Sequence, residues 1–180
     1  MSITIYMGCM FSGKTSMLIN YYTQWNNINK KVLMINYIDD NRYGDDNCVY
    51  SHNKIKVPCV KTKLLKDLSD NIINDVDVIL INEGQFFSDL VDFSLFWCEK
   101  YNKNIIVSGL DGDYLRRPFG QLHHLIPFAD DVIKLKAFCK KCNNGTPAIF
   151  TKRLSNESED IVIGTDNYVP LCRKHYNESL

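Results

Sequence analysis

The chain has 180 residues, of which 45% are hydrophobic and 23% are charged, as in an ordinary globular protein with a buried core. Lys and Arg number 21, as do Asp and Glu, so the formal net charge is zero. This balance argues against a nucleic-acid partner, because such binders carry a basic excess or a basic stripe. No apolar run approaches the ~18 residues of a membrane-spanning helix, and no leader precedes the first expected strand. We therefore expect a cytoplasmic protein without a membrane partner.

Strands and helices are expected to alternate along most of the chain. In chain order, the hydrophobic pattern predicts a strand at 2–7, a helix at 14–25, a strand at 32–37, an edge strand at 55–60 weakened by Pro58, a helix at 63–74, a strand at 76–82, a helix at 90–101, and strands at 104–110 and 132–135. Such alternation predicts an α/β fold, in which a mostly parallel sheet carries helices on both faces. The alternation stops near residue 137, so we expect two domains, 1–136 and 137–180.

Residues 8–15 read GCMFSGKT and match the phosphate-loop pattern G-x-x-x-x-G-K-[ST]. Glycines let the backbone curl so that successive N–H groups point inward, and the helix that follows adds the positive end of its dipole. We expect Lys14 to reach the β- and γ-phosphates of a nucleotide and the Thr15 hydroxyl to hold Mg²⁺. A chance match in a turn is the alternative, which the position between a strand and a helix disfavours. The predicted nucleotide-binding residues of this loop are Gly8, Cys9, Met10, Phe11, Ser12, Gly13, Lys14 and Thr15.

Acidic residues follow three of the predicted strands, where ligands bind in parallel sheets. In nucleotide-binding folds, a strand next to the phosphate loop often ends in an acidic residue near the metal, and Glu83 fits that role as a general base. A solvated turn residue before Gly84 is the alternative. Asp40 and Arg42 are candidates for metal and phosphate contacts, or for a local ion pair in a turn. Asp111 and Asp113 leave the same two readings open.

Two half-sites of the form C-x-x-[CH] lie about thirty residues apart, and together they predict a metal site. Cys139 and Cys142 form the first half-site, and Cys172 and His175 the second. Three thiolates and one imidazole select Zn²⁺, and four protein ligands leave no open position, so the zinc would be structural. A disulfide or unrelated buried thiols are the alternatives. The remaining cysteines have no such spacing, and we expect packed thiols at Cys9, Cys48, Cys59 and Cys98.

These motifs, taken in order, resemble those of the type II thymidine kinases, a family of cytosolic cellular enzymes and shorter viral and bacterial ones. The matching segments are GCMFSGKT, DNRY from Asp40, EGQFF from Glu83, LDGDYLRRPFG from Leu110, TKRL from Thr151, and IVIG with Tyr168 before CRKHY. The resemblance implies a RecA-like P-loop fold, with a small zinc domain that carries a substrate lasso. It also implies transfer of the γ-phosphate of ATP to the 5′-hydroxyl of deoxythymidine, with Mg²⁺ required.

The resemblance further assigns individual residues and partners. Glu83 would accept the proton of the 5′-hydroxyl, and Tyr114 would lie against the thymine. Further ATP contacts are implied for Asp40, Asn41, Arg42, Asn82, Glu83, Gly84 and Gln85. Thymidine contacts are implied for Tyr114, Thr151, Asp160, Ile161, Val162, Ile163, Gly164 and Tyr168. Family members are commonly homotetramers inhibited by thymidine triphosphate (dTTP), and a viral member would act in the host cytoplasm.

The chain departs from the family pattern at three positions: Cys9 stands where Pro is usual, Asn82 where Asp is usual, and His175 where a fourth Cys is more frequent. Asn82 removes one negative charge from the expected magnesium site, and Asp40 is a candidate to replace it. Two other functional classes remain open. A motor- or recombination-type ATPase would hydrolyse ATP without a nucleoside, and a zinc-ribbon binding module would retain only a vestigial nucleotide site.

Overall fold

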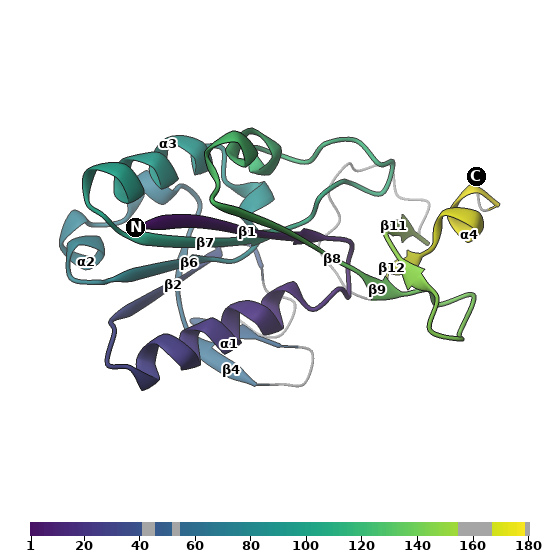
Figure 1. Ribbon diagram of the computed structural model, residues 1–180, viewed down its shortest axis with the longest axis horizontal. Helices are drawn as coiled ribbons and strands as arrows, with labels where there is room; N and C mark the ends of the chain where they lie inside the picture. The colour runs from purple at the N-terminus through teal and green to yellow at the C-terminus, as the bar shows by residue number, and fades with distance from the viewer. Residues whose placement is uncertain (41–45, 52–54, 155–166, 179–180) are drawn as a thin grey trace.

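The computed structural model describes residues 1–40, 46–51, 55–154 and 167–178. Its centre is a six-stranded sheet in the order β5-β2-β6-β7-β1-β8, in which every neighbouring pair is parallel (Figure 1). The strands are β1 (Ser2–Gly8), β2 (Val32–Tyr37), β5 (Val60–Thr62), β6 (Val78–Ile81), β7 (Asn104–Gly109) and β8 (Asp131–Leu135). The predicted parallel α/β sheet is confirmed. Because all strands run the same way, their carboxyl ends meet at one edge of the sheet.

Both faces of the sheet are covered (Figure 1). On one face lie α1 (Lys14–Asn27) and the hairpin of β3 (Cys48–Tyr50) and β4 (Lys56–Pro58), whose apolar side chains share one buried cluster with that face. A larger cluster on the other face joins the sheet to α3 and to several shorter helices. The helices between α1 and β8 are η1 (Leu65–Asp67), α2 (Asp70–Asn74), η2 (Gly84–Phe86), α3 (Leu90–Leu95), the π-helical η3 (Phe96–Lys100) and η4 (Leu122–Phe128).

Two predicted elements are divided in the structure. The helix expected at 63–74 is split because Leu68 has extended backbone angles, and the Asp89 carboxylate instead accepts bonds from the N–H groups of Leu65 and Lys66. The edge strand expected at 55–60 becomes two strands, with β4 ending at Pro58 and β5 joining the main sheet. Proline lacks an N–H group for a sheet, which accounts for the boundary.

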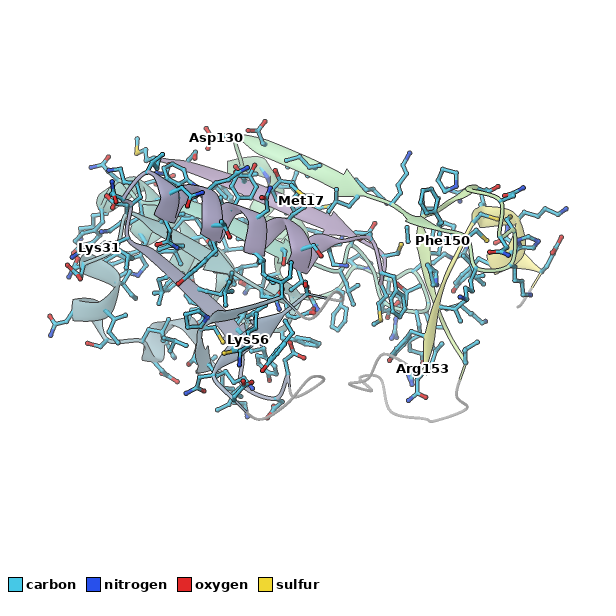
Figure 2. The ribbon with its side chains drawn as sticks, turned by 90° about the horizontal axis from the view of Figure 1, so that it is seen from below. Met17, Lys31, Lys56, Asp130, Phe150 and Arg153 are labelled. Atoms are coloured by element: carbon cyan, nitrogen blue, oxygen red, sulfur yellow. The ribbon has the colours of Figure 1, made fainter. Side chains whose placement is uncertain are left out.

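A smaller C-terminal part lies beyond the end of β8 and contains β9 (Ala137–Phe138), β10 (Pro147–Ala148), β11 (Phe150–Arg153), β12 (Tyr168–Leu171) and α4 (Arg173–Asn177). Figure 2 shows Phe150 and Arg153 in this part, at the far end of the molecule from Lys31. It has its own buried cluster, which includes Cys9 from the segment that follows β1. Among the helices formed by the described residues, none has the length and apolarity needed to cross a membrane.

Candidate functional site

The phosphate loop connects β1 to α1 at the carboxyl edge of the sheet. At Gly8 an added Cβ would lie 2.4 Å from the carbonyl oxygen of Leu135, so no side chain fits there. Gly13 has φ of 85°, in the left-handed region that glycine tolerates, and it precedes α1 without a side-chain cap. A helix that starts in this way presents its first N–H groups and the positive end of its dipole to an anion. The loop therefore has the backbone geometry that a phosphate group requires.

Lys14 folds back over this loop. Its ammonium Nζ donates to the carbonyl oxygen of Cys9 at 2.7 Å and lies 3.5 Å from the hydroxyl of Ser12. Its side chain is buried, so the positive charge is held inside the curve of the loop. A lysine at this place is positioned to meet phosphate oxygens that enter the loop.

Asn82 and Glu83 follow β6, whose end we predicted to lie beside the phosphate loop. In the sheet itself, β7 separates β6 from β1. Side chains bridge the gap: Asn82 Oδ1 accepts hydrogen bonds from Thr15 Oγ1 at 3.4 Å and from Ser108 Oγ, on β7, at 3.1 Å. Asn82 is therefore in direct contact with the phosphate loop although its strand is one position removed.

Glu83 is buried, with 6% of its surface exposed, which argues against a solvated turn residue. Its φ of 55° is in the left-handed region, a strained conformation for a residue with a side chain. Gln85 Nε2 donates to Glu83 Oε2 at 2.6 Å, while Gln85 Oε1 accepts from the N–H of Leu110 at 3.0 Å. The Gln85 amide thus fixes the Glu83 carboxylate against the end of β7. Strain and burial of this kind are common where a carboxylate has a chemical role.

The other acidic candidates have different partners. Asp111 forms an ion pair with Lys134 at 2.6 Å, and Asp113 pairs with Arg117 at the same distance. Asp113 therefore fits the reading of a local ion pair in a turn, whereas Asp111 pairs with a residue of β8. Asp40 accepts a hydrogen bond from Asn36 Nδ2 at 3.1 Å. Asn41 and Arg42, also predicted to contact ATP, lie outside the described residues.

Three of the residues predicted to bind thymidine are described, and they come from neighbouring segments. The Thr151 hydroxyl on β11 accepts a hydrogen bond from the N–H of Met10 in the phosphate loop at 3.0 Å. The Arg153 guanidinium lies 3.7 Å from the centre of the Tyr114 ring, and Tyr168 on β12 pairs with Arg153. This places the three residues around one strand pair beside the phosphate loop. The remaining predicted contacts, at 160–164, lie outside the described residues.

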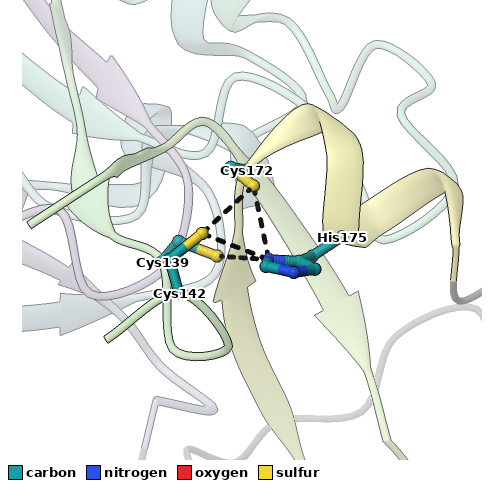
Figure 3. Close-up of side chains that lie close together, drawn as sticks. All are labelled: Cys139, Cys142, Cys172 and His175. Atoms are coloured by element: carbon teal, nitrogen blue, oxygen red, sulfur yellow. Dashed lines mark hydrogen bonds between the residues drawn. The ribbon is translucent and has the colours of Figure 1, made fainter. Parts of the chain in front are cut away.

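The four predicted zinc ligands converge at one point (Figure 3). The His175 Nδ1 atom lies 3.5 Å from Cys139 Sγ, 3.2 Å from Cys142 Sγ and 3.6 Å from Cys172 Sγ, and the Cys142 and Cys172 sulfurs are 3.8 Å apart. A tetrahedral Zn²⁺ with Zn–S bonds of about 2.3 Å separates two sulfur ligands by about 3.8 Å, and a sulfur from a nitrogen by slightly less. The residues therefore fit a zinc ion. All seven cysteines are free thiols, so the disulfide alternative is wrong.

Two thiols of the cluster have shifted pKa values: the pKa of Cys142 is raised, chiefly by burial, and that of Cys139 is lowered. Burial raises the pKa of the Cys139 thiol, but hydrogen bonds from the backbone of Cys172 and Cys142 and from His175 outweigh it, and the pKa lies at about 6. Cys139 is therefore a thiolate at neutral pH, the form that binds zinc. On the opposite side of the His175 ring, Nε2 lies 3.9 Å from a carboxylate oxygen of Glu178. A carboxylate near the second ring nitrogen is a common way to orient a histidine ligand.

Sequence reasoning missed two residues of this edge, Asn36 and Ser108. Asn36 Oδ1 accepts a hydrogen bond from Asn82 Nδ2 at 2.9 Å, and Ser108 bonds to the same Asn82 side chain. Each is a polar residue that follows an apolar run near the carboxyl end of its strand, VLMINY or NIIVSG. A buried polar side chain needs a partner, so its presence there was a readable signal of a polar site.

A parallel sheet whose first strand leads through a glycine-bounded phosphate loop into a helix defines a P-loop nucleotide-binding protein. A family model described as "Thymidine kinase" matches residues 1–176. The chain is 40% identical to a thymidine kinase of Monkeypox virus and 39% identical to one of vaccinia virus (strain Western Reserve), covering 98% of this chain and 97% of each relative. The chain therefore belongs to the thymidine kinase family, and it is an enzyme of the kinase class.

A thymidine kinase of rice (Oryza sativa subsp. japonica) is 39% identical over 97% of this chain, and the chain spans 65% of that protein's length. Among solved structures, domain III of the replication initiation protein DnaA from Thermotoga maritima aligns with 18% identity and a TM-score of 0.37, covering 74% of this chain and 54% of that one. A likeness of that size carries no conclusion about this chain.

Proposed function

We propose that the chain transfers the γ-phosphate of ATP to the 5′-hydroxyl of deoxythymidine to give dTMP. Its relatives are named for thymidine as the substrate, and the motifs of the family occur along nearly the whole chain. The observation that carries the proposal is the position of Glu83. Its buried carboxylate follows Asn82, which is hydrogen-bonded to Thr15 of the phosphate loop. Phosphoryl transfer to an alcohol needs a general base and a phosphate site close together, and both lie at the carboxyl edge of this sheet.

In this account the phosphate loop binds ATP through its inward N–H groups, and Lys14 neutralises charge on the phosphates. Mg²⁺ supplies further neutralisation of the phosphate oxygens when it is bound. Thr15 would be its protein ligand, since a phosphate-loop hydroxyl suits a cation that otherwise keeps waters and phosphate oxygens. Few protein ligands are therefore needed, and the neutral Asn82 is compatible with this site.

Glu83 takes the proton of the 5′-hydroxyl as that oxygen attacks the γ-phosphorus. The bond between the γ-phosphorus and the bridging oxygen of ADP breaks, and dTMP and ADP leave. Gln85 supports this step because its amide holds one carboxylate oxygen, which fixes the direction of the other. General-base catalysis of this kind depends on placing the carboxylate within hydrogen-bond reach of the hydroxyl.

The nucleoside would lie beside Tyr114 and the β11–β12 strand pair, with residues 160–164 and Tyr168 as the lasso. Cys139 and Cys142 follow β9, and Cys172 and His175 lie at the start of α4, next to this strand pair. A structural Zn²⁺ would therefore hold the base-binding segment in place. We also propose the division into 1–136 and 137–180, with Cys9 from the first part completing the core of the second.

The finer family properties follow only from the resemblance and are part of the proposal. They are a homotetramer, feedback inhibition by dTTP and action in the cytoplasm. Sedimentation of the pure protein gives its oligomeric state and tests the first. The rate of thymidine phosphorylation, measured with increasing dTTP at a fixed thymidine concentration, tests the second.

A direct test of the proposed reaction follows the transferred phosphate. The protein is incubated with ATP labelled at the γ-phosphate, Mg²⁺ and deoxythymidine, and the products are separated. We expect the label in dTMP and none in inorganic phosphate above a protein-free control. Label that appears mainly in inorganic phosphate, at a rate independent of thymidine, would instead support an ATPase.

A further inference from the structure

Four side chains form a continuous hydrogen-bonded chain at the carboxyl edge of the sheet. Asn36 Nδ2 donates to Asp40 Oδ2 at 3.1 Å, and Asn82 Nδ2 donates to Asn36 Oδ1 at 2.9 Å. Asn82 Oδ1 in turn accepts from Thr15 Oγ1 at 3.4 Å. This series of hydrogen bonds therefore runs from a loop after β2, through the ends of β2 and β6, to the phosphate loop.

The two amides at the centre of this chain are shielded from solvent. Asn36 and Asn82 are each 2% exposed, and Ser108, which also donates to Asn82, is 1% exposed. Buried amides keep the partners that the protein gives them, because leaving a buried donor or acceptor unpaired is unfavourable. The orientation of each amide is therefore set by its neighbours.

Only one of these four side chains, that of Asp40, has a fixed role as a hydrogen-bond acceptor. A carboxylate accepts hydrogen bonds and donates none, whereas an amide can turn either its oxygen or its nitrogen to a neighbour, and a hydroxyl can donate or accept. Asp40 therefore draws the NH₂ group of Asn36 towards itself, which turns the Asn36 oxygen to Asn82. Asn82 must then donate to Asn36, and this leaves its own oxygen facing Thr15 and Ser108.

The direction matters for Thr15. With the Asn82 oxygen towards it, the Thr15 hydroxyl donates its proton to Asn82 and keeps its lone pairs for a cation. With the amide reversed, Asn82 would donate to a Thr15 lone pair and would point an N–H group at the cation. Lone pairs on oxygen are what Mg²⁺ takes as ligands, so the reversed state is a poorer metal site.

We propose that Asp40 is a positioning residue, which acts through the Asn36 amide to keep the Asn82 oxygen towards Thr15 and the Thr15 lone pairs towards Mg²⁺. The proposal rests on the magnesium role of Thr15 in the proposed function. It assigns to Asn36 a part in metal binding although Asn36 does not reach the phosphate loop. A direct effect of the Asp40 charge on the cation is the competing explanation, and it needs no Asn36.

The test is an equilibrium titration of the full chain with a fluorescent ADP analogue, in the presence of Mg²⁺ and in EDTA. The ratio of the two dissociation constants gives the gain in affinity due to the metal. Asp40→Asn, which keeps the shape of the side chain, should reduce this gain about fivefold, the equivalent of one hydrogen bond, and leave binding in EDTA unchanged. Asp39→Asn removes a charge from an exposed neighbour outside the chain of bonds and should leave the gain unchanged.

A double-mutant cycle separates the two explanations. Asn36→Leu cuts the chain of bonds, so adding Asp40→Asn to it should have no further effect on the gain. If Asp40→Asn lowers the gain equally in both backgrounds, Asp40 acts directly and the proposal is wrong. It is equally wrong if Asp40→Asn alone has no effect. Asn36→Ala replaces Asn36→Leu if thermal unfolding shows that the leucine variant is not folded. Thr15→Val tests the underlying assignment: a gain unchanged in that variant overturns the magnesium role of Thr15 itself.

Discussion

The backbone N–H of Met10, in the phosphate loop, donates a hydrogen bond of 3.0 Å to the hydroxyl of Thr151, in the first strand of the β11–β12 pair. Cys9, next to Met10, is 1% exposed and belongs to the buried cluster of the C-terminal part. The loop that would bind the phosphates of ATP is therefore packed against the part that carries the zinc ligands. A substitution in either part should therefore affect ligand binding by the other.

Replacement of Thr151 tests this contact. Thr151→Val leaves the Met10 N–H without its buried acceptor, so we expect the dissociation constant for ATP to rise about fivefold. Thr151→Ser keeps the hydroxyl and should retain most of the affinity. Equilibrium binding of ATP to the two variants is the measurement. Equal affinities for the valine and serine variants would show that the hydrogen bond does not support the phosphate loop.

Glu83→Gln tests the general base. The amide keeps the size of the carboxylate but cannot accept a proton, so kcat should fall by ~10²-fold or more. Binding of ATP and thymidine should change little, because Glu83 acts on a hydroxyl proton and not on the phosphates. Glu99→Gln, at an exposed position in η3, is the matched control and should keep the parent kcat. A Glu83→Gln enzyme with most of the parent kcat would contradict the assignment.

Lys14→Ala should affect ATP and not the nucleoside. It removes the charge that the phosphate loop holds over the transferring phosphates, so the KM for ATP should rise and kcat should fall. The dissociation constant for thymidine should stay near that of the parent. Lys30→Ala, at the opposite end of α1 and paired with Asp77, serves as the control. Parallel losses of ATP and thymidine affinity in Lys14→Ala would indicate a folding defect instead of a lost phosphate contact.

The zinc assignment predicts one zinc ion per chain, measured by elemental analysis of the pure protein. Cys142→Ser should lose the metal and the thermal stability of the C-terminal part, since structural zinc binding contributes directly to folding. Cys48→Ser removes a cysteine from the β3–β4 hairpin and should keep the metal. Because Cys9 lies in the cluster beside the zinc ligands, chelation should weaken ATP binding as well as thymidine binding. A protein that has no zinc, or a Cys142→Ser variant with full activity, would refute the assignment.

The sequence identified the features that depend on short patterns. The phosphate loop and the alternation of strands and helices were readable because each follows from the spacing of a few residues along the chain. The four candidate zinc ligands were readable for the same reason, since the spacing of C-x-x-[CH] pairs can be recognised without knowledge of the fold.

The order of the strands was not readable in this way. The position of β7 between β1 and β6 depends on tertiary packing, and no spacing of residues along the chain indicates it. The chain of amides from Asp40 to Thr15 was missed for a related reason. Asn36 and Asn82 are 46 residues apart, and only the sheet brings them together. Likewise, the contact between Met10 and Thr151 joins residues 141 positions apart.

The central claim is that a nucleoside accepts the phosphate, and nucleoside-dependent release of ADP in a coupled assay tests it most directly. With ATP and Mg²⁺ present, we expect ADP release to be near background without a nucleoside and to rise strongly when deoxythymidine is added. Glu83→Gln should abolish the increase. Rapid release that does not depend on a nucleoside would point to an ATPase, and no release under any condition would point to a binding module; either result would contradict the account.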